Sequence, residues 1–128
     1  MISIDHTAVY VNDLEKTKAF YQEYFNAEAN EQYHNTKTNL RTYFLTFERG
    51  GRLEIMSKPD LPSIGTDGEH LGYIHLAFSV GGSKAVDDLT GRLRGDGYVV
   101  FSEPRTTGDG YYESCVADPD GNRIEIVG

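Results

Sequence analysis

An internal repeat is the feature of this sequence that most constrains its fold. Residues 4–11 (IDHTAVYV) match residues 73–80 (YIHLAFSV) at an offset of 69, and both carry His, then Ala two residues later, then a final Val. Residues 50–55 (GGRLEI) match residues 121–126 (GNRIEI) at an offset of 71. Two separate matches at nearly the same offset predict two copies of one structural unit.

The segment between the two copies has the composition of a linker. Residues 58–70 contain Pro59, Pro62, Gly65 and Gly68, which favour turns and loops over helices or strands. The length of 128 residues fits one domain. We therefore expect a single domain over residues 1–128, made of modules at about 1–57 and 71–128.

Both copies predict the same order of elements, namely a strand, a helix and three more strands. Strands are indicated by alternating apolar residues, and the helices by apolar residues spaced along one helical face. The predicted elements are strands 3–11, 28–34, 40–48, 52–57, 73–80, 97–103, 110–117 and 122–127, a helix that follows Asn12 and Asp13, and a helix over 84–95. The fold class is therefore α+β, with two tandem βαβββ modules and a helix on one face of each sheet.

The other face of each sheet carries polar side chains at equivalent positions. Successive side chains of a strand point to opposite faces. Since apolar residues such as Leu53 and Ile55 are expected under the helix, their neighbours lie on the uncovered face. That face then holds one His from each first strand and one Glu from each last strand, namely His6, Glu54, His75 and Glu125.

Two imidazoles and two carboxylates on one concave surface suit a divalent metal ion such as Zn²⁺, Ni²⁺, Co²⁺, Mn²⁺ or Fe²⁺. Four such ligands leave positions for water or substrate, as metal catalysis requires. A single His or Glu on a strand is more often solvent-facing or hydrogen-bonded than a ligand. The repeat favours the metal interpretation, because a merely exposed face gives no reason to place His and Glu at the same points of both copies.

Composition excludes several other classes of protein. Twenty acidic residues against twelve basic ones give a net charge of −8, which argues against binding to nucleic-acid phosphates. No apolar run approaches the ~20 residues that span a bilayer, and the N-terminus lacks the pattern of a signal peptide. The single cysteine, Cys115, excludes an internal disulfide and is expected to be a small buried residue. We therefore expect a cytoplasmic protein that acts on a small molecule.

The sequence resembles the vicinal oxygen chelate superfamily, which includes glyoxalase I, methylmalonyl-CoA epimerase, fosfomycin-resistance enzymes, extradiol dioxygenases and bleomycin-resistance proteins. The resemblance rests on His6, on Phe20 and Tyr21, on residues 75–78 (HLAF) and on the ending 118–125 (DPDGNRIE). It implies paired βαβββ modules that curl into a half-barrel around an inner metal-binding face, and a homodimer. In the common dimer, His6 and Glu54 of one subunit would meet His75 and Glu125 of the other.

Within the superfamily, the set His, Glu, His, Glu is that of bacterial glyoxalase I. The resemblance thus implies a metal-dependent lyase or isomerase acting on a hemithioacetal or related 2-oxo compound through a metal-bound enediolate. It implies that Glu125 removes a proton next to the carbonyl, and that Glu54 is the second carboxylate ligand and a partner acid or base.

Two positions depart from the glyoxalase I pattern for glutathione. The places of an Arg and an Asn that help to hold glutathione are taken here by Tyr10 and Lys58. Another thiol adduct, a coenzyme A thioester or a small dicarbonyl therefore stays open as the substrate. The alternatives are an epimerase or dioxygenase on the same metal scaffold, and a metal-free protein whose acidic cleft binds a cationic drug.

Overall fold

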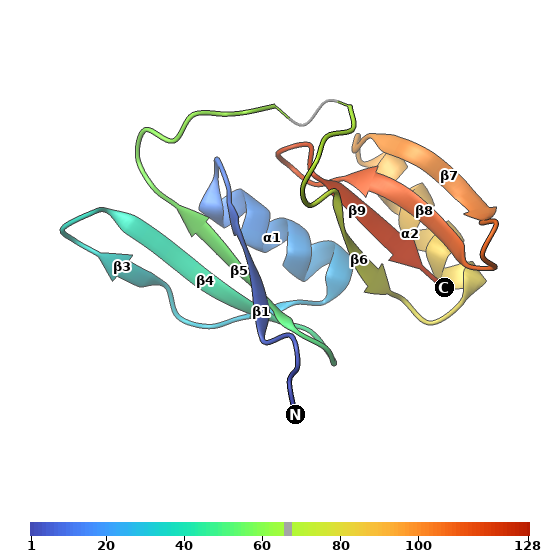
Figure 1. The fold of residues 1–128 in the computed structure, drawn as a ribbon, viewed down its shortest axis with the longest axis horizontal. Helices are drawn as coiled ribbons and strands as arrows, with labels where there is room; N and C mark the ends of the chain where they lie inside the picture. Colours follow the sequence, from blue (N-terminus) through green and yellow to red (C-terminus); the bar gives the residue numbers. More distant parts are fainter. Residues whose placement is uncertain (66–67) are drawn as a thin grey trace. The chain divides into compact units, whose positions relative to one another are not determined.

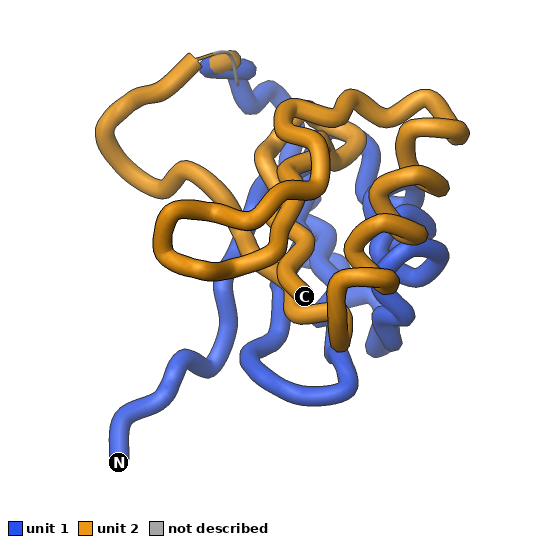
Figure 2. Tube along the Cα trace, turned by 90° about the vertical axis from the view of Figure 1, so that its right-hand side faces the viewer, with its two compact units in different colours: residues 1–64 blue, residues 65–128 orange. Residues whose placement is uncertain are grey.

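The computed structural model describes residues 1–65 and 68–128 (Figure 1). The chain divides into two compact units, residues Met1–Ile64 and Gly65–Gly128, which Figure 2 colours separately. Among the described residues, each unit contains one helix and one sheet.

Unit 1 is built from five strands and one helix. The elements are β1 (His6–Tyr10), α1 (Leu14–Phe25), β2 (Glu28–Ala29), β3 (Tyr33–Asn35), β4 (Leu40–Thr46) and β5 (Arg52–Ser57). The strand order is β1-β5-β4-β2, and β3 pairs separately with β4. β1 runs parallel to β5, whereas the other pairs are antiparallel.

Unit 2 repeats this plan with four strands. Its elements are β6 (His75–Ser79), α2 (Ser83–Gly95), β7 (Val100–Thr106), β8 (Tyr112–Ala117) and β9 (Arg123–Val127). The strand order is β6-β9-β8-β7, and β6 runs parallel to β9. The predicted tandem βαβββ fold is therefore confirmed, and neither sheet closes on itself.

The register of the parallel strands is the same in both units. Ala8 stands opposite Glu54 in unit 1, and Ala77 stands opposite Glu125 in unit 2. His6 lies two residues before the first alanine, and His75 two residues before the second. Because side chains two residues apart on a strand share a face, each His lies on the same sheet face as the Glu of its unit.

Helix α1 begins and ends where the sequence provides capping groups. The Asp13 carboxylate accepts a hydrogen bond from the backbone N–H of Lys16 at 3.0 Å, and Asn26 ends the helix in the left-handed conformation, with φ 54°. Leu14, Phe20 and Tyr21 are buried, as the apolar spacing predicts. They cover the face of the sheet that carries the buried side chains of β5.

Helix α2 departs at one position from the stripe that its apolar spacing predicts, which is Val86, Leu89 and Leu93. Val86 and Leu93 are fully buried, but Leu89 is only half-buried and Thr90 is buried instead. The Thr90 hydroxyl donates to the Val86 carbonyl oxygen at 2.6 Å and lies 2.6 Å from Ser114 Oγ on β8. Because the Thr90 hydroxyl is hydrogen-bonded on both sides, its burial leaves no polar group unpaired.

Two predicted strands are shorter than the sequence indicates. The predicted strand 28–34 is two strands, β2 and β3, because its pairing with β4 shifts by one residue between them. Asn30 fills the break, since its side chain accepts from the backbone N–H of Phe44 at 2.8 Å. The predicted strand 73–80 begins only at His75. Strand alternation over 73–80 predicts that Ile74 lies on the helix-covered face with Leu76 and Phe78, but Ile74 is 40% exposed.

Candidate metal centre

In unit 1 the predicted ligands His6 and Glu54 face each other from neighbouring strands. The distance from His6 Nε2 to Glu54 Oε1 is 3.8 Å, and the Glu54 side chain is 18% exposed. β1 and β5 are paired in parallel, so the two side chains project from the same face of the sheet. The first His–Glu pair of the sequence is therefore also a pair in space.

His6 has further partners on its other ring atoms. Its Nδ1 lies 2.7 Å from Asp5 Oδ2, and the same carboxylate oxygen accepts from Arg52 Nη2 at 2.7 Å. The His6 ring meets the Phe44 ring edge to face, with centroids 5.2 Å apart. Hydrogen bonds from His6 and Arg52 hold the pKa of Asp5 below its ordinary value, so this carboxylate stays charged at neutral pH.

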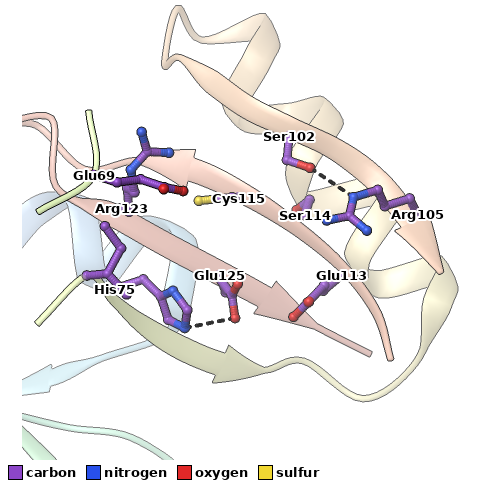
Figure 3. A pocket seen from close by; sticks show the side chains of 10 residues that line it. Glu69, His75, Ser102, Arg105, Glu113, Ser114, Cys115, Arg123 and Glu125 are labelled. Atoms are coloured by element: carbon purple, nitrogen blue, oxygen red, sulfur yellow. Dashed lines mark hydrogen bonds and ion pairs between the residues drawn. The ribbon is translucent and has the colours of Figure 1, made fainter. Parts of the chain in front are cut away.

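In unit 2 the predicted ligands His75 and Glu125 are closer. His75 Nε2 lies 3.1 Å from Glu125 Oε1, and Figure 3 shows the two side chains turned toward each other from β6 and β9. They line a cavity of about 290 Å³. Its full lining is Glu69, Ile74, His75, Ser102, Arg105, Glu113, Ser114, Cys115, Arg123 and Glu125.

The cavity changes the acidity of Glu125. Burial raises the pKa of this carboxyl, and the nearby negative charge of Glu113 raises it further. His75 and Arg105 act in the opposite direction, because a positive charge favours the ionised carboxylate. The net result is a carboxylate that holds its proton more firmly than an ordinary Glu.

Several cavity residues were not predicted from the sequence. Cys115, expected as a buried core residue, is half-buried instead and lines the cavity, because it stands directly opposite Glu125 in the β8–β9 pairing. Glu113 lies on the same face two residues earlier. Burial raises the pKa of the Cys115 thiol. The β8–β9 register together with strand alternation is enough to put Cys115 and Glu113 on the face that carries Glu125, but the sequence does not give that register.

Arg105 and Arg123 bring positive charge to the same cavity. Arg105 Nε donates to Ser102 Oγ at 3.4 Å, which keeps its side chain along the cavity wall in Figure 3. The Arg123 guanidinium stacks on the Phe101 ring, 4.2 Å from its centroid. Both side chains are placed to meet an anionic group that enters the cavity.

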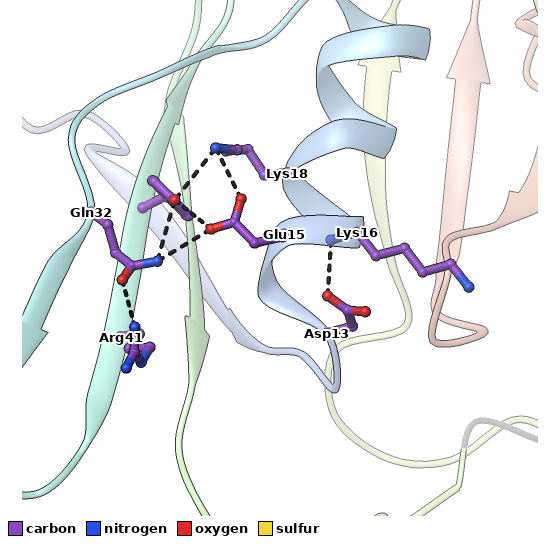
Figure 4. Close-up of polar contacts among 7 residues, drawn as sticks. Asp13, Glu15, Lys16, Lys18, Gln32 and Arg41 are labelled. Carbon is purple, nitrogen blue, oxygen red and sulfur yellow. Dashed lines mark hydrogen bonds and ion pairs between the residues drawn. The ribbon is translucent and has the colours of Figure 1, made fainter.

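A second polar cluster in unit 1 joins α1 to the sheet and lies outside the predicted ligand set. Figure 4 shows it around Glu15, Lys18 and Gln32. The Tyr43 hydroxyl donates to Glu15 Oε1 at 2.5 Å and accepts from Gln32 Nε2 at 3.2 Å. These contacts satisfy a buried tyrosine, so the cluster has a structural role.

The structure brings the four predicted ligands together as two pairs. Among residues 1–65 and 68–128, no group of three or more His, Cys, Asp or Glu side chains is arranged to hold a metal ion. The binding of one ion by His6, Glu54, His75 and Glu125 therefore stays a prediction.

Comparison with known proteins identifies the family. Residues 3–126 match the Glyoxalase/Bleomycin resistance protein/Dioxygenase superfamily, so the chain belongs to this superfamily. The chain is 31% identical over 114 residues to the uncharacterized protein YwkD of Bacillus subtilis (strain 168), across 80% of this chain and 89% of that protein. The resemblance to the vicinal oxygen chelate superfamily is thereby confirmed.

Solved structures agree with this assignment. A glyoxalase family protein from Enterococcus faecalis superimposes with a TM-score of 0.78 at 27% identity, over 98% of this chain and 96% of that one. The trypanothione-dependent glyoxalase I of Leishmania major gives a TM-score of 0.78 at 22% identity, over 100% of this chain and 87% of that one. The second similarity is evidence for the fold alone.

In the part of the chain that the structure describes, neither helix has the length and apolar character needed to cross a membrane.

Proposed function

We propose that this protein is a divalent-metal-dependent lyase or isomerase of the glyoxalase I type, which acts on a hemithioacetal or a related 2-oxo compound. The observation that carries the proposal is the His75–Glu125 pair, 3.1 Å apart in a cavity, together with its equivalent His6–Glu54 in the other unit. Membership of the glyoxalase superfamily supports the same chemistry.

The donor atoms fit a divalent cation. Nitrogen and oxygen ligands lie about 2.0–2.2 Å from Zn²⁺, so two adjacent ligands are roughly 3 Å apart. The 3.1 Å between His75 Nε2 and Glu125 Oε1 meets this requirement, and the 3.8 Å between His6 and Glu54 is within reach of a small rotation of the Glu54 side chain. A bound ion would supply positive charge that polarises the carbonyl oxygen of the substrate.

Glu125 is proposed as the base of this reaction. Burial raises its pKa, and a carboxylate of raised pKa is a stronger proton acceptor than an exposed one. In this role Glu125 takes the proton from the carbon next to the carbonyl, and a proton then returns to the adjacent carbon. Glu54 is proposed as the second carboxylate ligand and as the partner acid or base.

The complete site is proposed to lie in a homodimer. Following the common arrangement in the superfamily, His6 and Glu54 of one subunit would join His75 and Glu125 of the other. Such an arrangement requires one ligand pair in each unit, and each pair is formed within its own unit.

The thiol or carrier of the substrate is not fixed by these residues. Tyr10 and Lys58 stand where glyoxalase I has its glutathione-binding Arg and Asn, so another thiol adduct, a coenzyme A thioester or a small dicarbonyl stays open as the substrate. An epimerase or dioxygenase on the same metal scaffold is the second candidate. The net charge of −8 favours a metal-free binder of cationic drugs, but such a binder does not need paired His and Glu side chains.

Metal content of the purified, tag-free protein tests the proposal. We expect near-stoichiometric Ni²⁺, Co²⁺, Zn²⁺ or Mn²⁺ by plasma mass spectrometry, and loss of the metal in His75→Ala. His34→Ala is the matched control, because His34 is exposed, its ring bonds to the Asn39 side chain, and it lies outside the proposed ligand set. Activity would then be sought with methylglyoxal–thiol adducts.

A wild-type protein that binds no metal after reloading would refute the metal-dependent enzyme and leave the drug-binding alternative. Oxygen consumption with a catechol by the Fe²⁺-loaded protein would instead favour the dioxygenase over the lyase.

A further inference from the structure

The two histidines of the proposed site are held differently. His6 Nδ1 lies 2.7 Å from Asp5 Oδ2, whereas the residue before His75 is Ile74, whose side chain carries no hydrogen-bonding group. Within residues 1–65 and 68–128, the ion pair described for His75 is the one that its Nε2 makes with Glu125. Among the described residues, the His6 imidazole therefore has a carboxylate at Nδ1, whereas the equivalent His75 imidazole has no such carboxylate.

Asp5 is itself fixed in place, although its side chain is 71% exposed. Its carboxylate accepts from Arg52 Nη2 at 2.7 Å, and its backbone carbonyl accepts from the Arg52 N–H at 3.0 Å. A Cβ at Gly51 would lie 3.5 Å from the Asp5 carbonyl oxygen and 3.3 Å from that of Ile4. The chain before β1 thus packs closely on the start of β5, and the carboxylate cannot swing away without losing Arg52.

Aromatic contacts complete the arrangement around His6. The Arg52 guanidinium stacks 4.4 Å from the centroid of the Phe44 ring, and the Phe44 ring contacts the edge of His6. Asp5, His6, Phe44 and Arg52, here called the Asp5 cluster, each contact at least two others of the set. The His6 ring therefore has a defined plane and a defined direction.

We propose that Asp5 is a positioning residue for His6: it accepts the Nδ1 proton and so leaves the Nε2 lone pair facing Glu54. A neutral imidazole carries one N–H, and the hydrogen bond at one nitrogen decides which nitrogen keeps it. Histidine ligands of metals commonly have such a partner, which fixes the ring and strengthens the ligand. The part of the inference that concerns metal affinity rests on the proposed function, but the tautomer of His6 does not.

A purely structural role for Asp5 makes a different prediction. If Asp5 served only as an exposed ion-pair partner of Arg52, its removal would alter stability slightly and leave the His6 ring protonation unchanged. The effect of removing the Asp5 side chain on which ring nitrogen of His6 carries the proton therefore distinguishes the two roles.

The test is ¹⁵N NMR of the histidine rings in the metal-free full-length protein at about pH 8, which is above the ordinary imidazole pKa of about 6.5. The His6 signals are assigned by their loss in His6→Ala. We expect His6 to carry its proton on Nδ1 in the wild type and to shift toward the Nε2–H form in Asp5→Ala. Asp88→Ala is the control, because it also removes one acidic side chain from an ion pair, with Lys84 at 2.5 Å on α2.

Metal affinity gives the second readout, measured by absorbance during Co²⁺ titration. We expect Asp5→Ala to weaken Co²⁺ binding about 10–100-fold, and Asp88→Ala to leave it unchanged. An Nε2–H tautomer for His6 in the wild type, or an unchanged tautomer in Asp5→Ala, would overturn the inference even if Co²⁺ binds. An Nδ1–H tautomer in a wild type that binds no Co²⁺ would refute the proposed function and leave Asp5 as the residue that sets the His6 tautomer.

Discussion

Asp118 is a buried carboxyl group outside the proposed site, at the turn that leads into β9. Its side chain accepts hydrogen bonds from the backbone N–H groups of Asp120 at 2.9 Å and Asn122 at 2.8 Å. Burial raises the pKa of Asp118, although these hydrogen bonds act to lower it. The folded protein therefore binds a proton at this residue more tightly than the unfolded chain does.

The sign of the resulting pH dependence follows directly. Since the folded state holds the Asp118 proton more tightly, the contribution of Asp118 to stability is largest below its ordinary pKa of 3.8 and falls as pH rises through the raised value. We expect the unfolding free energy of the wild type minus that of Asp118→Asn to fall as pH rises from below 3.8 through the raised pKa of Asp118. Urea unfolding at a series of pH values checks this, and a difference that rises with pH would contradict it.

A second residue-scale prediction concerns the buried hydroxyl pair of Thr90 and Ser114. The Thr90 hydroxyl donates to Val86, so the Ser114 hydroxyl donates to Thr90. Thr90→Val leaves the Ser114 hydroxyl buried without a partner, which we expect to cost about 1–3 kcal/mol. Urea unfolding measures the loss.

The double variant Thr90→Val/Ser114→Ala is the control for this pair. It removes both hydroxyls, so we expect it to lose less stability than the sum of the two single variants. Losses that simply add would show that the two hydroxyls are not coupled.

At the scale of helices and strands, the sequence predicts the elements that depend on local periodicity. The buried face of α1 and the buried residues Leu53, Ile55, Ile124 and Ile126 follow from helical and strand spacing alone. The equivalence of the two units follows from the repeat. These features need no knowledge of which strands pair.

Features that depend on strand register were missed. The break between β2 and β3 arises from a shift in pairing with β4, and the placement of Cys115 beside Glu125 arises from the β8–β9 register. Thr90 was missed for a related reason, since its buried hydroxyl also meets Ser114 on β8, a contact that depends on how the helix lies on the sheet. Long-range pairing, rather than local propensity, decides each of these cases.

The start of α1 gives a prediction at this scale. The Asp13 side chain satisfies the Lys16 N–H at the helix N-terminus, so Asp13→Ala should reduce the unfolding free energy by about 1 kcal/mol. Asp13→Ser, which also provides an N-cap oxygen, should retain most of the stability. Thermal and urea unfolding compare the two, and equal losses would show that the cap contributes nothing.

For the whole molecule, the proposed division of the ligands between subunits predicts complementation. His6→Ala damages the first ligand pair and His75→Ala the second, so each homodimer should lose its metal sites. In a mixed dimer with sites shared between subunits, one site receives both substitutions and the other receives none. We therefore expect an equimolar mixture of the two variants, after random subunit exchange, to regain about a quarter of the Co²⁺ sites that wild-type dimers bind, because about half of the dimers are then mixed and each mixed dimer has one intact site of two.

The matched control is a mixture of His6→Ala with Glu54→Ala, which both alter the first ligand pair and cannot complement each other. Failure of the first mixture to bind Co²⁺, when mixed dimers are shown to form, would place each complete site within a single chain.

The parallel pairing of the first and last strands of each unit also bears on how the protein is made. His6 lies on β1 and Glu54 on β5, so nearly the whole of unit 1 separates these partners along the chain. As the nascent chain leaves the ribosome, His6 emerges long before Glu54. Neither half of the proposed metal centre can therefore assemble until its unit has been synthesised to the last strand. Binding of an ion to a ligand pair during synthesis would therefore occur only after that unit has folded. A chain truncated before β5 would contain His6 without its partner Glu54.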